Sequence, residues 1–403
     1  MNRHYGMKNE ATIQFVFDHR EEDVRALALR GSRDKDVDLP WALDQIQGWQ
    51  TARHKLPSWA AIDGIVYPPH LSMEQCSSEA TAIYKCGIIN RLPKGSRGTL
   101  IDLTGGFGVD FAFMARCFDQ ACYVERQAHL CDTAKHNFGL LGLPQARVIN
   151  ADAEQVLSDM KTEPSSTLLY LDPARRDSNK ARTYAITDCT PNVLELLPRL
   201  LQCGHHVLLK LSPMLDWHKA VADLGNHVAE VHIVSVGNEC KELLVLMDIA
   251  HEGEPRVHCV NDDQSLIYRP TQDSIAPAIA TSDDAQYLYE PNASVMKAGC
   301  FGLLTERYPV KALATDSHLF VSNEQAMDFP GRRFAIIAVT TMNKKDLGRV
   351  LSGFSRANVA TRNFPMTVQE LRKRLGLKDG GDTYIFGTTT ATGERRLYIC
   401  NKL

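Results

Sequence analysis

The sequence lacks the features that mark membrane, secreted and disulfide-bonded proteins. It has no run of the roughly 18 uncharged apolar residues that a membrane-spanning helix requires. Its first residues, MNRHYGMKNEATIQF, contain no apolar core followed by a small-residue cleavage site, so we expect a cytoplasmic protein. The 11 cysteines form no CxxC pair, and the 14 histidines form no HxxxH pair with a third ligand beside it. We therefore expect reduced thiols and no metal site.

Positive charge is concentrated at one end of the chain. The 403 residues have a net charge of -3, but residues 331–403 hold 14 Lys and Arg against 5 Asp and Glu. An acidic body thus carries a basic C-terminal piece, which can bind the phosphates of a nucleic acid. Such a piece can equally be a solvated basic face without a polyanionic partner.

The N-terminal residues 1–73 have the apolar spacing of helices, and we assign no chemistry to them. Prolines and a glycine interrupt residues 57–70, which we expect to form an irregular connector. A further helix is predicted from Met73 to Leu92.

From Gly98 onward, short apolar strands alternate with helical stretches, as in a parallel α/β sheet flanked by helices. The predicted strands are Thr99–Leu103, Ala121–Val124, Arg147–Asn150, Thr167–Leu171, His205–Leu211, Val228–Val234 and Glu242–Ile249. The connection between the last two is too short for a crossover helix, so they should pair antiparallel. This pattern fits the seven-stranded, Rossmann-like sheet of class I methyltransferases better than the all-parallel dinucleotide-binding fold.

After Ala250 the polar stretch HEGEPR indicates a domain edge, and residues 251–330 predict a small α+β segment with a helix over 293–306. In the last part we predict a strand over 334–340, helices over 344–353 and 368–375, and a hairpin of 383–388 with 395–400. The helix over 368–375 should begin with a capping box of Thr367 and Glu370 and end at Gly376.

The most informative string is Asp102-Leu-Thr-Gly-Gly-Phe-Gly108, a strand end followed by a glycine-rich turn. Glycines let the backbone come close to a ligand because they have no Cβ. The Rossmann fingerprint needs GxGxxG directly after the strand, which this turn lacks. The string resembles motif I of S-adenosylmethionine methyltransferases, so we expect this cofactor to contact Asp102, Thr104, Gly105, Gly106 and Gly108.

Acids also end the next two strands. Glu125 ends the second, where a carboxylate can accept both ribose hydroxyls, and Asp152 with Ala153 follows the third, where an acid can contact the adenine amine. The structural alternatives are an exposed acid and a helix N-cap. Because ligand residues of open α/β sheets gather at the carboxyl edge, we assign all three to the cofactor.

The string Asp172-Pro-Ala-Arg175 follows the fourth strand, where substrate and methyl group should meet. It is similar to the D/N-P-P-x motif of nucleic-acid base methyltransferases. Asp172 would accept a hydrogen bond from an amine, Pro173 would fix the backbone, and Arg175 and Arg176 would hold a phosphate or carboxylate. Ala174 replaces the second proline and no aromatic follows, which makes amine methylation a weaker prediction than the cofactor.

Methylation of pyrimidine C5 needs a cysteine nucleophile at the same edge. The fifth strand ends near Lys210 without a cysteine, and Cys203 lies before that strand, so we expect no covalent C5 chemistry. Lys210 either contacts the substrate, as we predict, or points to solvent.

The whole chain resembles the bacterial class I methyltransferase-like proteins with a THUMP-like C-terminal domain. The resemblance rests on the strings EQCSSEATA (74–82), LTGGFGVD, LDPARRD, LYEPNA, VMKAG, TRNFP and LKDGGD. It implies a helical part over 1–73, a methyltransferase domain over 74–250, a ferredoxin-like segment over 251–330 and a THUMP-like domain over 331–403. By the same resemblance Gln75 and Ser78 would line the cofactor, unless they only cap a helix.

THUMP domains accompany tRNA-modifying enzymes, and Arg372, Lys373 and Arg374 form a basic triplet on a capped helix. We therefore predict an S-adenosylmethionine-dependent methyltransferase that modifies a base nitrogen of structured RNA, tRNA or rRNA. The alternatives are a methyltransferase of a small molecule or protein, and a non-catalytic RNA-binding protein of this fold. The sequence leaves the oligomeric state open.

Overall fold

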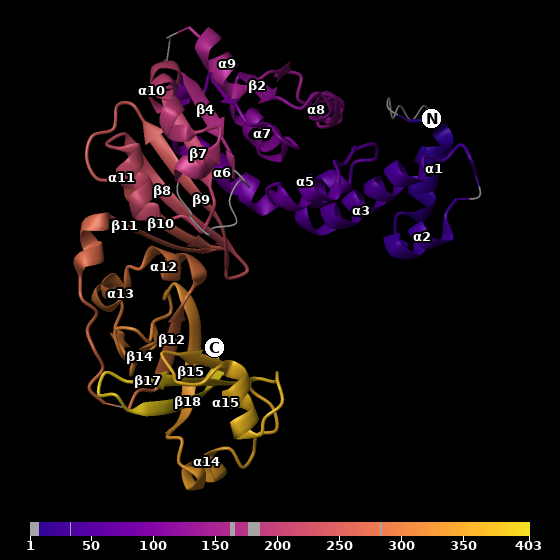
Figure 1. Ribbon diagram of the computed structural model, residues 1–403. Helices are drawn as coiled ribbons and strands as arrows, with labels where there is room; N and C mark the ends of the chain where they lie inside the picture. Colours follow the sequence, from indigo (N-terminus) through magenta and orange to yellow (C-terminus); the bar gives the residue numbers. More distant parts are fainter. Residues whose placement is uncertain (1–7, 33, 162–165, 176–185, 283) are drawn as a thin grey trace. The chain divides into compact units, whose positions relative to one another are not determined.

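The computed structural model (Figure 1) describes residues 8–32, 34–161, 166–175, 186–282 and 284–403. The chain forms two compact units, Met1–Ala229 with Glu242–Gly253 and Glu230–Lys241 with Glu254–Leu403. No described helix is long and apolar enough to cross a membrane. All cysteines are free thiols in buried or half-buried positions, as predicted.

Helices build the N-terminal part of the first unit, as predicted. They are α1 (Glu10–His19), α2 (Val24–Arg30), α3 (Leu39–Lys55), α4 (Pro57–Ala60) and α5 (His70–Gln75). The side chains of Asn9 and Asp23 cap α1 and α2 by accepting hydrogen bonds from their first turns. The connector predicted over 57–70 contains one helical turn, α4, which begins at Pro57.

The helix predicted from Met73 to Leu92 is broken in the middle. The first piece, α5, ends at Gln75, and α6 (Glu79–Arg91) begins after Ser78, whose side chain accepts a hydrogen bond from the Thr81 amide (3.3 Å). Between them the backbone is extended at Cys76 and Ser78. The break leaves Ser77 buried, which matters for the site described below.

All seven strands predicted between residues 99 and 249 are present in one nine-stranded sheet, of order β11-β10-β8-β9-β7-β4-β1-β2-β3. They are β1 (Thr99–Asp102), β2 (Gln120–Glu125), β3 (Ala146–Asn150), β4 (Thr167–Leu171), β7 (His206–Leu211), β8 (Val228–Val236) and β9 (Glu239–Asp248). Strands β3, β2, β1, β4 and β7 pair in parallel, and β9 is antiparallel to β7. The turn Gly237-Asn238, with positive φ at both residues, joins β8 to β9 as the predicted hairpin.

Two further strands extend this sheet beyond the seven that were predicted. They are β10 (Arg256–Asn261), parallel to β8, and β11 (Gln264–Tyr268), antiparallel to β10. The polar stretch before them therefore does not end the first sheet, although residues 254–403 belong to the second unit.

Helices alternate with the parallel strands, as in other α/β sheets. They are α7 (Val109–Met114), α8 (Ala128–Leu140), α9 (Ala153–Asp159), α10 (Val193–Cys203) and α11 (Trp217–Leu224), with short 3-10 turns at Lys94–Ser96, Ala115–Cys117 and Ile186–Asp188. The small ladder of β5 (Ala174–Arg175) and β6 (Cys189–Thr190) lies between β4 and α10 in the chain. Because these strands are parallel, the loops that leave their carboxyl ends meet at one edge of the sheet.

The second unit contains a seven-stranded sheet of order β13-β14-β12-β15-β18-β17-β16. Its strands are β12 (Tyr287–Pro291), β13 (Lys311–Ala312), β14 (Phe320–Ser322), β15 (Gly331–Thr340), β16 (Asn358–Arg362), β17 (Thr383–Thr389) and β18 (Arg395–Lys402). β17 and β18 form the predicted hairpin. Because β12 pairs with β15, the segment before residue 331 and the basic end build one sheet, with Phe334, Phe386 and Tyr398 in its core.

The helices of the second unit are shorter than predicted except for the last. They are α12 (Ala293–Ala298), α13 (Phe301–Arg307), α14 (Lys344–Val350) and α15 (Val368–Leu375), with a 3-10 turn at Pro270–Ser274. The single helix predicted over 293–306 is two helices, because Gly299 adopts φ 80° and ends α12. The capping box of Thr367 and Glu370 and the stop at Gly376 are present in α15 as predicted.

Candidate functional site

The turn after β1 needs glycine at three positions. A Cβ on Gly105 would lie 2.2 Å from the ring of Tyr123, while Gly106 and Gly108 have φ of 54° and 83°. The Tyr123 hydroxyl donates a hydrogen bond to the Gly106 carbonyl (2.5 Å). The glycine-rich string therefore forms a tightly held backbone turn at the carboxyl edge of the sheet.

Asp102 and Thr104 connect this turn to the end of β4. Asp102 is buried and accepts a hydrogen bond from the Thr104 amide (2.9 Å). Thr104 Oγ1 in turn accepts one from the amide of Asp172 (2.6 Å). Burial raises the pKa of Asp102 well above its usual range; the Thr104 amide opposes this shift, and the carboxylates of Asp110 and Asp172 add to it.

The acids after β2 and β3 are held differently. Both oxygens of Glu125 accept backbone hydrogen bonds, one from Gly106 (2.9 Å) and one from Gln127 (2.9 Å). Asp152 stands at the N-cap position of α9, but its side chain makes no capping hydrogen bond, and Ala153 begins the helix. Asp152 therefore occupies the N-cap position, but its carboxylate does not act as a helix cap.

These carboxylates offer the acceptors that S-adenosylmethionine requires. Asp102 and Glu125 end β1 and β2, and Asp152 lies two residues after the end of β3. Their carboxylate oxygens can accept hydrogen bonds from an amino group, a ribose diol and an adenine amine. Each Glu125 oxygen keeps a second lone pair beside its backbone hydrogen bond. The donor and acceptor chemistry of the edge therefore fits this cofactor.

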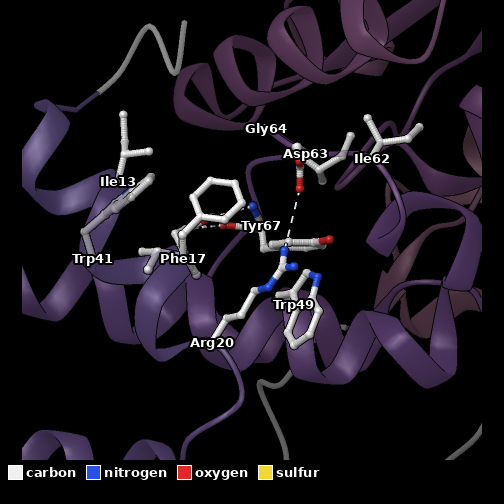
Figure 2. A pocket seen from close by; sticks show the side chains of 12 residues that line it. Ile13, Phe17, Arg20, Trp41, Trp49, Ile62, Asp63, Gly64 and Tyr67 are labelled. Atoms are coloured by element: carbon white, nitrogen blue, oxygen red, sulfur yellow. Dashed lines mark hydrogen bonds and ion pairs between the residues drawn. The ribbon is translucent and has the colours of Figure 1, made fainter. Parts of the chain in front are cut away.

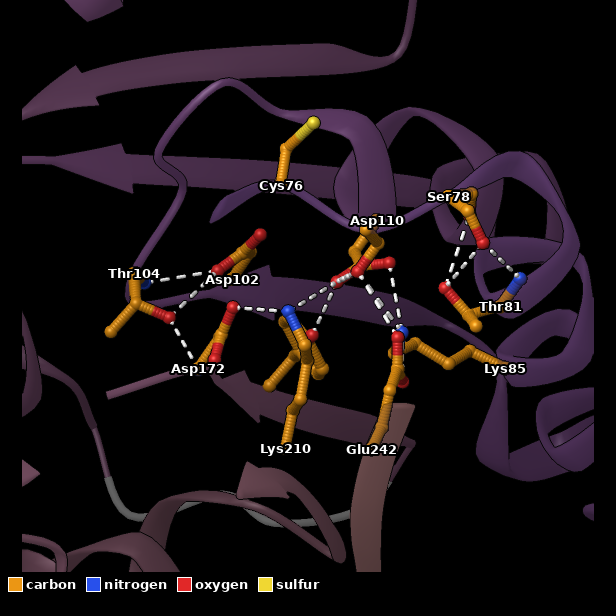
Figure 3. Close-up of polar contacts among 12 residues, drawn as sticks. Cys76, Ser78, Thr81, Lys85, Asp102, Thr104, Asp110, Asp172, Lys210 and Glu242 are labelled. Carbon is orange, nitrogen blue, oxygen red and sulfur yellow. Dashed lines mark hydrogen bonds and ion pairs between the residues drawn. The ribbon is translucent and has the colours of Figure 1, made fainter. Parts of the chain in front are cut away.

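Asp172 and Lys210 form an ion pair at the same edge. Their Oδ2 and Nζ atoms lie 2.6 Å apart, and the side chains are 38% and 13% exposed (Figure 3). Burial would lower the pKa of Lys210, but Asp172 and Asp110 raise it, so Lys210 stays an ammonium at neutral pH. The geometry thus turns Lys210 toward Asp172 and not toward solvent.

The rest of the Asp172 string is described only in part. Pro173 is buried, and Arg175 pairs through its backbone with Cys189. The side chain of Arg175, and all of Arg176, lie outside the described residues.

Behind Asp172 lies a row of buried charges that was not predicted from the sequence. Lys85 of α6 contacts Asp110 of α7 (Nζ to Oδ1, 3.0 Å) and Glu242 of β9 (Nζ to Oε2, 2.5 Å). Asp110 Oδ2 also lies 3.9 Å from Lys210 Nζ. We call Glu242, Lys85, Asp110, Lys210 and Asp172 the ion chain, because negative and positive groups alternate along it (Figure 3). With three carboxylates and two ammonium groups, the ionised chain has one excess negative charge.

Asp110 is the best-connected member of the ion chain. It accepts hydrogen bonds from Ser77 (2.7 Å) and from the Tyr170 hydroxyl (2.6 Å). Burial would raise the pKa of Asp110, but Lys85 and Lys210 with these hydrogen bonds lower it to about 2. Lys85 stands on the buried face of α6, where a charged side chain needs a partner, but the spacing of apolar residues in the sequence did not identify that face.

The segment before α6 contains the predicted residues Gln75 and Ser78 and also Ser77, which was not predicted. Ser78 caps α6, as the structural alternative proposed, and Gln75 is exposed at the end of α5, whereas Ser77 binds Asp110. Cys76 also lies at the site (Figure 3). Burial raises the pKa of Cys76 to about 11, so it stays a thiol and is a poor nucleophile. The prediction of no covalent C5 chemistry assumed that no cysteine lies at this edge; that assumption is wrong, and the absence of that chemistry stays a prediction.

Several cations of the basic end are paired inside the second unit. Glu290 of β12 is 3% exposed and accepts hydrogen bonds from Arg332 Nε (2.7 Å) and from Arg362 (2.6 Å). Arg396 likewise pairs with Glu394 (2.7 Å). Arg332 and Arg362 join β15 and β16 to β12, and all three arginines already have a carboxylate partner. The net charge of the basic end therefore overstates the cations that a polyanion can reach.

The three residues of the predicted RNA-contacting triplet on α15 differ in exposure and in their partners. Arg372 pairs with Asp379 (2.8 Å) and is 27% exposed, while Lys373 and Arg374 are exposed. We therefore retain Lys373 and Arg374 as the accessible part of the triplet.

Two groups of described residues have possible metal-ligand atoms within 4.8 Å of one another: His205, His206 and Asp248, and Glu230, His232 and His258. In the buried second group, Glu230 already binds Arg256 (2.5 Å) and His232 (3.0 Å). These contacts compensate the negative charge of Glu230 without a metal ion. That the protein binds no metal stays a prediction.

A cavity lies among the N-terminal helices and shares no lining residue with the ion chain (Figure 2). Arg20 enters it, with its guanidinium 4.6 Å from the ring centre of Trp49 and 5.3 Å from that of Phe17. Its Nη1 lies 3.6 Å from Asp63. These contacts hold α1 against α3 and the loop after α4.

Comparison with known proteins gives the family. The second unit matches the family models of a ferredoxin-like domain over residues 287–330 and of a THUMP domain-like family over residues 331–402. A crystal structure from Porphyromonas gingivalis W83, of a protein assigned as a methyltransferase, is similar over 97% of each chain, with 31% identity and a TM-score of 0.85. No curated protein matches the chain.

Two shorter structures are similar only in part. An rRNA methylase from Streptococcus thermophilus is 14% identical over 41% of this chain and 93% of its own, with a TM-score of 0.32. A Streptococcus mutans protein assigned as a methyltransferase, in complex with SAH, is 13% identical over 41% of this chain and 96% of its own, with a TM-score of 0.30. Scores this low support no argument, whereas the match over nearly the full length does: the chain belongs to the family of bacterial class I methyltransferase-like proteins with ferredoxin-like and THUMP-like C-terminal domains.

Proposed function

We propose that the protein is an S-adenosylmethionine-dependent methyltransferase that modifies a base nitrogen of structured RNA, tRNA or rRNA. The observation that carries this proposal is the Asp172 carboxylate, which pairs with Lys210 while the backbone amide of Asp172 donates to the Thr104 hydroxyl next to the glycine-rich turn. Asp172 lies at the carboxyl edge of the sheet, where ligands of open α/β sheets bind.

The cofactor would be held by Asp102, Thr104, the three glycines of the turn, Glu125, Asp152 and Ala153. When bound, S-adenosylmethionine supplies an electrophilic methyl group on a sulfonium. The protein then has to orient the accepting nitrogen and manage its proton. Asp172 can accept a hydrogen bond from the N–H of that nitrogen, with Pro173 restricting the local backbone. Lys210 cannot act as the base, because it is already protonated.

An RNA substrate is supported by the basic THUMP-like domain. Its exposed cations Lys373 and Arg374 can contact phosphates without breaking an ion pair of the unit. In the proposal Arg175 and Arg176 hold a phosphate next to the target base. The excess negative charge of the ion chain favours a nitrogen that becomes cationic during transfer over an anionic nucleophile.

The test is transfer of labelled methyl from S-adenosylmethionine to total RNA from a strain that lacks this gene. Asp172→Asn keeps the shape of the side chain but loses the charge, and Asp132→Asn, on an exposed part of α8, is the matched control. We expect label in RNA with the wild type and Asp132→Asn, and at least a hundredfold less with Asp172→Asn, in line with the roughly 10²–10⁴-fold of general acid–base catalysis.

Other outcomes redirect the proposal. If calorimetry detects cofactor binding but no RNA accepts label, the substrate is a small molecule or a protein, or the protein binds RNA without catalysis. If the cofactor does not bind, the enzyme proposal is wrong.

A further inference from the structure

Lys85 is an unusual residue to find at the centre of a helix face. Its side chain is 0% exposed, and its ammonium meets three acceptors: Asp110 (3.0 Å), Glu242 (2.5 Å) and Ser77 Oγ (3.3 Å). Replacing a buried ion pair by apolar residues of similar size is often neutral or stabilising. Fold stability alone therefore gives little reason for a lysine here, and its effect on neighbouring charges gives a better one.

That effect follows from the position of Asp110 between two lysines. Lys210 lies 2.6 Å from Asp172 and 3.9 Å from Asp110, so the two carboxylates compete for it. Lys85 compensates the charge of Asp110 from the other side and leaves Lys210 with Asp172. Without Lys85, Asp110 and Glu242 would be buried carboxylates with one cation in reach, and Lys210 would move toward Asp110.

We propose that Lys85 and Glu242 are positioning residues of the site: through Asp110 they keep Lys210 on Asp172 and so fix the carboxylate that meets the substrate nitrogen. This inference rests on the proposed function for its role in methyl transfer. In that step the lone pair of the nitrogen forms the bond to the methyl carbon, and the pair of the broken carbon–sulfur bond stays on sulfur. The nitrogen, now cationic, releases a proton to Asp172, from which it passes to solvent.

The charges around Asp172 determine the sign of each variant's effect. Its described titratable neighbours are Lys210 of β7, Asp110 of α7, Lys85 of α6, Asp102 of β1 and Tyr170 of β4. Glu242 of β9 acts on it through Lys85 and Lys210. Removing the cation Lys85 should raise the pKa of Asp172, because Lys210 is then shared. Removing the anion Glu242 should lower the pKa of Asp172, because Lys85 then pairs with Asp110 alone.

The experiment is a pH titration of the full-length protein labelled with 13C at the aspartate carboxyl carbons, followed by NMR, with Asp172→Asn to assign the signal. We expect Lys85→Met to raise the Asp172 midpoint by about one pH unit and Glu242→Gln to lower it. Lys135→Met, which removes an exposed lysine of α8, should leave it unchanged. Midpoints that do not move, or that move in the same direction in both variants, would overturn the proposal.

Two provisions keep the test decisive. If Lys85→Met does not fold, Glu242→Gln, which keeps the size of the side chain, decides the sign. The titration needs neither cofactor nor substrate, so it still decides the positioning role if the wild type transfers no methyl and the proposed function fails. Where transfer is observed, the acidic limb of its pH profile should move with the Asp172 midpoint, which a merely structural role would not produce.

Discussion

Glu290 offers the sharpest stability test in the second unit, because one buried carboxylate holds two arginines from different strands. It stands on β12, and its partners are Arg332 of β15 and Arg362 of β16. We predict that Glu290→Gln lowers the free energy of unfolding of this unit by about 2 kcal/mol.

The magnitude follows from the exposure of the three groups. Breaking a fully buried ion pair costs about 3–5 kcal/mol. Here the carboxylate is 3% exposed, but Arg332 and Arg362 are 34% and 38% exposed, so water can solvate their guanidinium groups after the change. Glutamine also keeps one oxygen as an acceptor, and both corrections reduce the expected loss.

The assay is urea unfolding followed by far-UV circular dichroism, with Glu394→Gln as control. Glu394 pairs with Arg396 of the same unit but is 55% exposed, so its loss should cost less than about 0.5 kcal/mol. All four tryptophans belong to the first unit, so their fluorescence reports whether the loss is confined to the second. Equal losses in Glu290→Gln and Glu394→Gln would refute the reasoning.

Three further predictions concern the RNA surface, the cofactor turn and the ion chain. Lys373→Glu with Arg374→Glu should weaken tRNA binding and reduce the slope of log affinity against log salt by about 1.5, as measured by filter binding. Gly105→Ala should weaken S-adenosylmethionine binding at least about tenfold in calorimetry, because the new Cβ forces the Tyr123 ring and the turn apart. The pKa of Asp110 is lowered to about 2 in the folded state, so the ionised carboxylate stabilises the fold by about 2 kcal/mol. This stabilisation is complete above about pH 4 and is lost as the pH falls toward 2. In acid unfolding curves, Asp110→Asn should not show this loss of stability.

Each of these has a result that contradicts it. An unchanged salt slope would show that α15 does not contact the RNA backbone, and Lys135→Glu, on α8 of the first unit, is the charge control. Wild-type affinity in Gly105→Ala would mean that the turn does not approach the cofactor. Parallel acid curves for wild type and Asp110→Asn would mean that Asp110 is not held as a carboxylate by the two lysines.

The sequence alone predicted the features that depend on neighbouring residues. Strand periodicity, the glycine-rich turn and the acids at strand ends lie within short windows, and parallel strands necessarily bring their carboxyl ends to one edge. This is why the order of strands and turns in the chain was enough to place Asp102, Glu125 and Asp172 at one edge. The capping box and glycine stop of α15 are equally local, and both are present.

Only the tertiary structure decided which charges meet. Lys85, Asp110 and Glu242 belong to α6, α7 and β9, and no spacing rule relates residues so far apart in the chain. The same holds for Glu290 with its two arginines, which were counted as cations of a basic surface. The physical reason is that a buried ionised side chain is stable only beside groups that compensate its charge. Folding brings these groups together from distant strands and helices, and the local sequence around one group does not predict the other.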